Sequence, residues 1–279
     1  MSYAEGRERF NKAFDGFFKS IWAVIRRFIE ETGELVQFAI EALRLVMAKP
    51  FRGHDIVQHM EFVGNKSVII ICLSGLFTGM ALAFQIYLGF KKVNATSLIG
   101  PTVALGITRE LAPVLTGLIV AARAGGAMAA RIGTMRVTEQ IDALEVMGVN
   151  PVQYLVSPRV LAATVIMPLL TGVFDFVAML GCWLIAIQLL GLDEAAFWDR
   201  IISWIEPYHI YEGLFKGAIF GLFFGLICTH RGFNTKGGAA GVGESTNKGV
   251  VTSMVMIIVL DFFVTNLINL FYGLKSRFM

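Results

Sequence analysis

The sequence predicts an all-α membrane protein with N-terminal amphipathic helices at the membrane interface, five transmembrane helices and one short cytoplasmic helix. Two observations predict this class. Hydrophobic residues fill 56% of the 279 positions and charged residues only 16%, whereas soluble domains carry about a quarter charged residues. Five apolar stretches are also long enough to cross a bilayer, which takes about 20 residues. We therefore divide the chain into an N-terminal region, 1–65, and a five-span domain, 66–279.

The N-terminal region is predicted to lie along the membrane surface rather than to cross it. Large apolar residues recur there at helical spacing between lysine, arginine and glutamate residues: Phe14, Phe17, Phe18, Ile21, Trp22, Ile25, Phe28 and Ile29. Such a helix suits the headgroup plane. Gly33 is expected to end it, and a second amphipathic piece follows from about Glu34 to Ala48. A soluble helical hairpin packed on a partner would show the same pattern, so both interpretations stay open.

The five spans are predicted at about 66–90, 98–122, 160–190, 212–230 and 250–272. An odd number of spans places the two termini on opposite sides of the membrane. With the N-terminus inside, loops 123–159 and 230–249 carry seven basic residues, against five in the external segments. The basic residues of the N-terminal region strengthen this bias. The positive-inside rule therefore predicts a cytoplasmic N-terminus and an external C-terminus.

A short cytoplasmic helix is predicted at about 134–147, between the second and third spans. Thr134 can cap its start, Gly148 can take the left-handed position after its end, and Pro151 prevents its continuation. At 100° per residue, one face carries Val137, Ile141 and Leu144. The other face combines acids with a small apolar pair: Met135, Glu139, Asp142, Glu145 and Val146. A docking surface and a solvated loop helix both fit this pattern.

A long run around this helix resembles a known family. The segment ARAGGAMAARIGTMRVTEQIDALEVMGVNP is similar to the signature segment of the MlaE family of ABC-transporter permeases, and approximate similarity extends from about Phe62 to Tyr272. The resemblance implies that helix 134–147 is the coupling helix that rests on the ATPase subunit. The coupling residues would then be Met135, Arg136, Glu139, Asp142, Glu145 and Val146.

The resemblance also implies a function and a set of partners. It implies a multi-pass permease of the bacterial inner membrane, with its C-terminus in the periplasm, that moves phospholipids between inner and outer membrane for outer-membrane lipid homeostasis. Such a permease would be a homodimer bound to a separate ABC ATPase. A periplasmic MCE-domain protein and a STAS-domain subunit would complete the system.

The chain itself is expected to be non-catalytic and to carry no cofactor. It has no Walker A motif, so ATP hydrolysis is expected in the partner ATPase. Its three cysteines and four histidines are scattered without the spacing of a metal site. A net charge of +3 without a basic patch does not indicate nucleic-acid binding.

Ionisable residues inside the spans are the best candidates for a functional site. Arg109 and Glu110 fall in the second span, Asp175 in the third and Asp261 in the fifth. They could form a purely structural network. Alternatively, Arg109 meets the phosphate of a lipid headgroup while Glu110 tunes that site. A lipid-binding stripe for acyl chains is proposed on the first span, at Phe77, Met80, Phe84 and Tyr87; such a stripe can equally be an ordinary lipid-facing or core surface.

Glycines recur every four residues along the fourth span, at Gly213, Gly217, Gly221 and Gly225. With Gly75 and Gly79 on the first span they predict close helix packing, within the subunit or across a dimer.

Two other classes of function remain as alternatives. A gradient-driven secondary transporter or channel would use Arg109, Glu110 and Asp261 as an ion or proton relay, although the sequence shows no convincing internal repeat. An intramembrane lipid-modifying enzyme would need a polar catalytic cluster at the membrane surface.

Overall fold

The computed structural model describes Trp22, Arg26, residues 29–46 and residues 52–278, with side chains up to Tyr272. These residues form helices and short connections without any strand, which confirms the all-α class. The predicted interfacial helix that begins near Phe14 lies almost wholly outside the described residues. Residues 29–46 form one unbroken helix that passes through Gly33. The predicted break at Gly33 is therefore wrong, since a single glycine is tolerated inside a helix, and the second amphipathic piece is the continuation of this helix.

Five helical segments of the described chain are long and apolar enough to cross a membrane, as predicted. The first is α2 (Gly53–Lys91). The second runs without a break through η1 (Thr96–Leu98), α3 (Ile99–Gly106), η2 (Ile107–Leu111), α4 (Ala112–Val120), η3 (Ala121–Gly125) and α5 (Gly126–Val137). The third comprises η4 (Val152–Val156), α7 (Ser157–Trp183) and η5 (Leu184–Leu189). The fourth is α9 (Pro207–Phe233) and the fifth lies in α10 (Gly238–Phe278).

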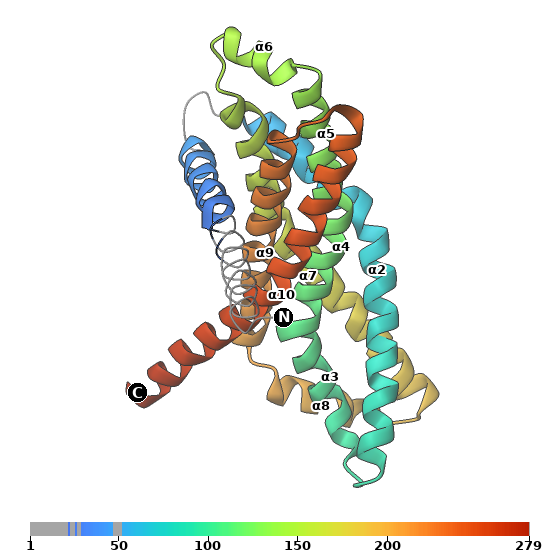
Figure 1. Cartoon of the computed structure of the whole chain (residues 1–279). Coiled ribbons are helices and arrows are strands. Elements are labelled where there is room, and N and C mark those ends of the chain that lie inside the picture. The colour runs from blue at the N-terminus through green and yellow to red at the C-terminus, as the bar shows by residue number, and fades with distance from the viewer. Residues whose placement is uncertain (1–21, 23–25, 27–28, 47–51, 279) are drawn as a thin grey trace, which may run out of the picture.

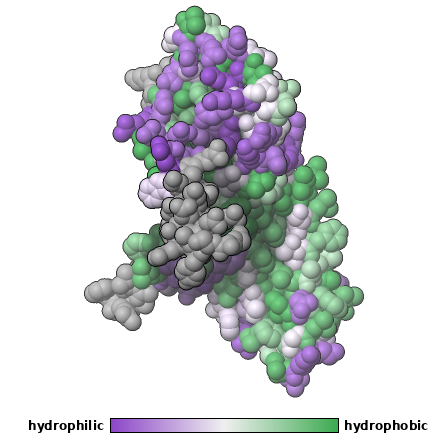
Figure 2. Space-filling view, in the orientation of Figure 1, coloured by the Kyte–Doolittle hydropathy of each residue, from purple (hydrophilic) through white to green (hydrophobic). Residues whose placement is uncertain are grey.

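The spanning helices form one bundle with a polar end and an apolar body (Figures 1 and 2). The short helix α6 (Gln140–Val146) stands at the polar end, and the amphipathic helix α8 (Glu194–Trp204) lies at the opposite end. We call these the α6 end and the α8 end. At 1.5 Å per residue, the 39 residues of α2 measure roughly 58 Å, about twice the hydrocarbon thickness. The helices therefore project beyond the bilayer.

Glycines allow the closest helix contacts inside the bundle. A Cβ atom on Gly213 would lie 2.1 Å from the carbonyl oxygen of Thr108, and one on Gly221 would lie 2.6 Å from that of Ala163. A Cβ on Gly79 would likewise meet the backbone of Ala178 at 1.8 Å. The glycine stripe of α9 thus packs within the subunit, against η2 and α7.

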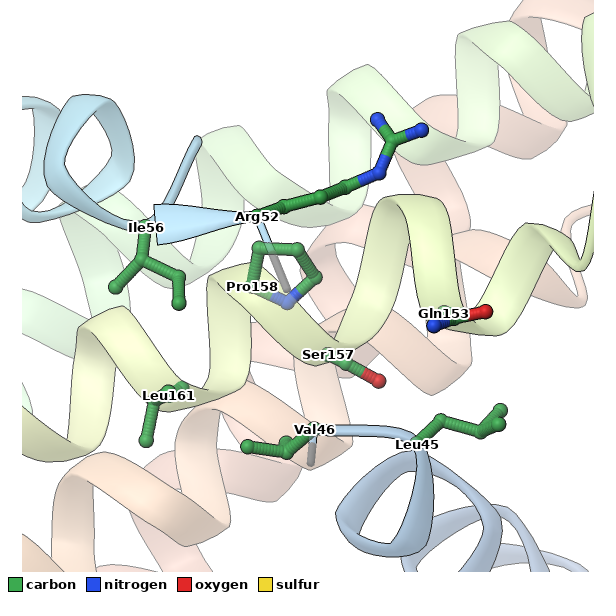
Figure 3. A pocket seen from close by; sticks show the side chains of 8 residues that line it. All are labelled: Leu45, Val46, Arg52, Ile56, Gln153, Ser157, Pro158 and Leu161. Carbon is green, nitrogen blue, oxygen red and sulfur yellow. The ribbon is translucent and has the colours of Figure 1, made fainter. Parts of the chain in front are cut away.

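The helix of residues 29–46 packs on the bundle near its α6 end. Phe38 contacts the rings of His230 and Phe233, with centroid distances of 5.1 and 5.8 Å. Ser157 donates a hydrogen bond to the carbonyl oxygen of Ala42 at 2.9 Å. A small cavity remains beside this junction, about 20 Å³ in volume, and Figure 3 shows the side chains around it: Leu45, Val46, Arg52, Ile56, Gln153, Ser157, Pro158 and Leu161. This helix therefore belongs to the folded unit.

The stretch predicted as one helix, 134–147, is divided in the structure. α5 continues the second span as far as Val137, and Thr134 donates its hydroxyl to the carbonyl oxygen of Ala130 instead of capping a new helix. The chain turns at Glu139, which adopts a left-handed conformation with φ of 59°, and α6 begins at the next residue. The predicted end is confirmed, because Gly148 has φ of +73° and donates to the carbonyl oxygen of Glu145.

Candidate functional site

A network of charged side chains lies inside the bundle, toward the α8 end. Glu212 and Lys216 are one helical turn apart on α9, and both are buried. Arg109 on η2 reaches Glu212 with an Nε–Oε2 distance of 3.0 Å and donates to Asn269 of α10 at 2.9 Å. Buried charges are tolerated when they are paired and hydrogen-bonded. Helices α9 and α10 and the turn η2 are therefore joined by charge pairs in an apolar body.

Lys216 is the centre of this network. Its Nζ lies 3.1 Å from Glu110 Oε2, 3.4 Å from Asp261 Oδ1 and 3.7 Å from Glu212 Oε1. One ammonium group thus contacts three carboxylates. Glu212 and Lys216 form the buried layer, whereas Arg109, Glu110 and Asp261 keep part of their side chains exposed. The exposed layer presents charges of both signs.

A proline explains how Lys216 is held. Its ammonium group donates to the backbone carbonyl oxygen of Arg109 at 2.7 Å. Four residues further along the helix stands Pro113, which has no N–H to donate to that carbonyl. The turn that carries Arg109 is π-helical, a widened form often found at functional sites. The local sequence TRELAP therefore removes one N–H donor near this carbonyl, and Lys216 donates to it.

The structure brings together three of the four predicted intramembrane residues and separates the fourth. Arg109, Glu110 and Asp261 meet around Lys216. Asp175 instead borders a cavity of about 450 Å³ between α7, α8 and α9, and neither of its carboxylate oxygens has a hydrogen-bond partner among the described residues. The other lining residues are almost wholly apolar: Ala104, Thr108, Gly172, Phe176, Met179, Leu180, Trp198, Ile201, Ile205, Ile210 and Leu214.

Glu212 and Lys216 were absent from the predicted site, although the sequence held a signal for them. They are spaced i, i+4 at the start of the fourth apolar stretch, so that an acid and a base share one helix face. A carboxylate and an ammonium at that spacing inside a span indicate a buried pair.

The predicted acyl-chain stripe lies on an open face of α2. Phe77 and Phe84 are 62% and 45% exposed, while Met80 and Tyr87 are partly buried. The opposite face of the helix is the one that packs on α7. In the single chain Phe77 and Phe84 are therefore uncovered, whereas Tyr87 packs against the core.

The predicted coupling residues surround α6 at the polar end. Val146 is 89% exposed, and Glu139, Asp142 and Glu145 are exposed beside it. Met135 differs, because it is half-buried against the core at the α6 end. Arg136 of α5 pairs with Asp142 of α6 at 2.6 Å. The outward surface of α6 is thus acidic, with Ala143, Val146 and the following Met147 as exposed apolar residues.

α6 is attached firmly to the spans on both sides. Ile141 is fully buried among Val152, Leu155 and Leu226. After the helix, Asn150 accepts hydrogen bonds from the backbone N–H groups of Val152 and Gln153, at 2.9 and 3.1 Å, and so caps the start of the third span. A displacement of α6 would therefore be transmitted to α5 and α7.

Comparison with known proteins gives one family. The family model described as "Permease MlaE" matches residues 56–267. A "Probable ABC transporter permease protein" of Rickettsia conorii is 36% identical over 241 residues, which cover 86% of this chain and 93% of the relative. The "Intermembrane phospholipid transport system permease protein MlaE" of Haemophilus influenzae is 35% identical over 213 residues, covering 75% and 81%. A "Probable ABC transporter permease protein" of a Synechocystis strain is 41% identical over 209 residues, covering 75% and 80%.

Proposed function

The chain belongs to the MlaE permease family, and from this membership we propose that it is the membrane subunit of an ABC transporter that moves phospholipids between the inner and outer membranes. The names of the Rickettsia and Haemophilus relatives support this proposal. So do the five apolar helices of the bundle. A gradient-driven transporter is not favoured, because the relatives are named for ABC transport.

The proposed mechanism rests on one observation: helix α6 is exposed and is firmly attached to the spans. ATP would be hydrolysed by a separate ATPase subunit that binds the acidic surface of α6. Closure of that partner would push on α6, and the buried Ile141 and the pair Arg136–Asp142 would pass the movement to the second and third spans. No covalent chemistry by this chain is involved.

The same proposal orients the protein in a bacterial inner membrane. An ATPase on α6 places the α6 end and the N-terminus in the cytoplasm, so that the C-terminus is periplasmic. The basic residues near the α6 end agree with the positive-inside rule. We further propose a homodimer with a periplasmic MCE-domain partner and a STAS-domain subunit beside the ATPase, as the family resemblance implies.

The charged network is the proposed contact for the lipid headgroup. Arg109 keeps a quarter of its side chain exposed, and Glu110 and Asp261 are partly exposed beside it. A guanidinium group suits a phosphate, and carboxylates suit an amine. An exposed layer with both charges would therefore fit a zwitterionic headgroup better than a simple anion.

Co-purification with the ATPase tests the proposal. Glu145→Lys and Val146→Asp change the outward surface of α6 without touching the pair Arg136–Asp142. We expect the tagged wild-type chain to retain a stoichiometric ATPase and phospholipid in mild detergent, and both variants to lose the ATPase. Asp199→Lys, an exposed acid on α8 at the other end, is the matched control and should retain it. Equal ATPase retention by all four proteins would contradict docking on α6.

A further inference from the structure

Three cationic side chains surround one aromatic ring between the first and second spans. The ring is that of Phe62 on α2. Lys66 Nζ, Arg123 Cζ and Arg131 Cζ lie 5.8, 5.7 and 5.8 Å from its centroid. Any two of these charges are therefore within roughly 12 Å of each other, close to the screening length of about 10 Å in 0.1 M salt. We call Lys66, Arg123 and Arg131 the cation cluster.

The cation cluster has no acidic counter-ion among the residues that the structure describes. Within the described part of the chain, no carboxylate is at ion-pair distance from any of its three members. Other cations near the same end of the bundle are paired, for example Arg52 with Asp55 and Arg231 with Glu31. Three like charges held together repel one another, so an anion bound between them would lower the free energy.

Part of the cation cluster is already fixed in position. The Arg123 guanidinium donates to the Ser67 hydroxyl at 2.7 Å and to the carbonyl oxygens of Val63 and Phe62 at 3.4 and 3.5 Å. Ser67 is itself fully buried. Lys66 and Arg131 are exposed and free to adjust. Lys66 and Arg131 can therefore turn toward an anion that binds at Arg123 without any movement of the helices.

The surface next to the cation cluster indicates which anion is available. Ile69 and Ile70, about one turn beyond Lys66 on α2, are 70% and 44% exposed. This apolar surface must face acyl chains in a membrane, so the cation cluster lies at its edge, where headgroup phosphates are found.

We propose that Lys66, Arg123 and Arg131 bind the headgroup phosphate of an anionic phospholipid in the leaflet on the α6 side. Basic pockets between spanning helices bind such headgroups in other membrane proteins. This lipid is held at the opposite end of the bundle from the charged network around Lys216. The inference requires only that the chain spans a membrane, so it does not depend on transport or on an ATPase.

Lipid retention by the purified full-length protein tests this site. The test variant is Lys66→Gln/Arg131→Gln, which leaves the hydrogen-bonded Arg123 in place. The matched control is Lys91→Gln/Lys92→Gln, which removes the same charge at the α8 end. Dioleoylphosphatidylglycerol and dioleoylphosphatidylcholine are added in turn, and native mass spectrometry counts the bound lipids. We expect the wild type and the control to prefer phosphatidylglycerol, and the test variant to bind it roughly tenfold more weakly, since each basic residue near a membrane surface contributes to anionic-lipid binding.

Two outcomes would overturn the proposal. Equal phosphatidylglycerol binding by the test variant and the control would show that the cation cluster holds no lipid. Displacement of the lipid by inorganic phosphate would identify a site for the free ion instead. Retention of the ATPase by the test variant separates this experiment from the test of α6, because a folded protein that has lost only the lipid site should still dock its partner.

Discussion

Lys216 holds the charged network together at the scale of single residues. It is the one cation within ion-pair distance of Glu110, Glu212 and Asp261 together among the described residues. Arg109 forms its ion pair with Glu212 alone in the described part of the chain. The network therefore depends on one ammonium group more than on any one carboxylate.

Replacing Lys216 by methionine should destabilise the protein strongly. The substitution keeps the apolar stem but leaves Glu110 and Asp261 without their cation and the buried Glu212 with Arg109 alone. Breaking a buried pair costs roughly 3–5 kcal/mol. Thermal unfolding in detergent would measure the effect. Lys236→Met, at an exposed position, is the control and should change little. Equal unfolding temperatures for the two variants would show that Lys216 carries no stabilising charge pair.

Replacing Asp175 should have the opposite effect on stability from replacing Lys216. An unpartnered carboxyl group beside an apolar cavity costs free energy, and an apolar side chain of similar size would not. Asp175→Leu should therefore leave the unfolding temperature unchanged or raise it. A clear loss of stability in this variant would mean that Asp175 has a partner in the membrane.

The sequence located several of these residues but not their neighbours. Arg109, Glu110 and Asp261 were recognisable because charges inside spans are costly and need partners. Their meeting at Lys216 depends on which faces α9 and α10 turn toward η2, and helical spacing within one span does not determine that. Asp175 shows the same limit of sequence-based prediction. Its depth in the span suggested a charged partner, but its face of α7 points to an apolar cavity.

At the scale of helices, the glycines of α9 let it pack closely on its neighbours. Gly213 touches the backbone of Thr108, one residue before Arg109. The separation of α9 from η2 therefore sets the geometry of the charged network. The glycine spacing in the sequence was sufficient to predict tight packing, and the structure identifies the partners as η2 and α7.

Gly213→Ala should destabilise the bundle and disturb the pair Arg109–Glu212. The added Cβ would overlap the Thr108 carbonyl, and overpacking of this kind costs about 1–3 kcal/mol. Gly243→Ala is the matched control, because nothing lies within 4 Å of a Cβ there and alanine favours a helix. We expect the unfolding temperature to fall for the first variant and to stay the same or rise for the second. A fall in both would point to a general effect of glycine substitution.

Helix ends were predicted less well than helix positions. The second span was expected to end near residue 122 because polar residues begin there, yet its helix continues to Val137. Hydropathy reports where the membrane ends, whereas α5 ends where the chain turns at Glu139. The glycine at position 148 was predictable because a left-handed residue is a local requirement.

At the scale of the whole molecule, the bundle has one polar end and a wide apolar surface (Figure 2). In the most apolar 18-residue stretch of α10, only 11% of the residues are buried. Five spans could be predicted because hydropathy depends on short windows of sequence. The arrangement of the spans and the packing of residues 29–46 on α7 and α9 depend on contacts between distant segments, which the sequence alone does not specify.

Labelling of introduced cysteines would establish the orientation. Val146→Cys at the α6 end should react with a membrane-impermeant maleimide only in inverted vesicles, and Ser203→Cys on α8 only in intact cells with a permeabilised outer membrane. The native protein is the control for background labelling, because Cys182 and Cys228 are buried and the partly buried Cys72 lies within the first span. Labelling of both positions from the same side would contradict the proposed topology.

The link between Pro113 and Lys216 means that an uncharged residue helps to determine the position of the Lys216 ammonium group. The acceptor for Lys216 is a main-chain oxygen, so replacing the Arg109 side chain would leave the lysine tethered. An alanine at position 113 would instead supply an N–H that competes for the same oxygen. The ammonium already contacts three carboxylates, so it would lose part of its main-chain anchor and keep its ion pairs. An uncharged substitution would then shift a positive charge inside the membrane.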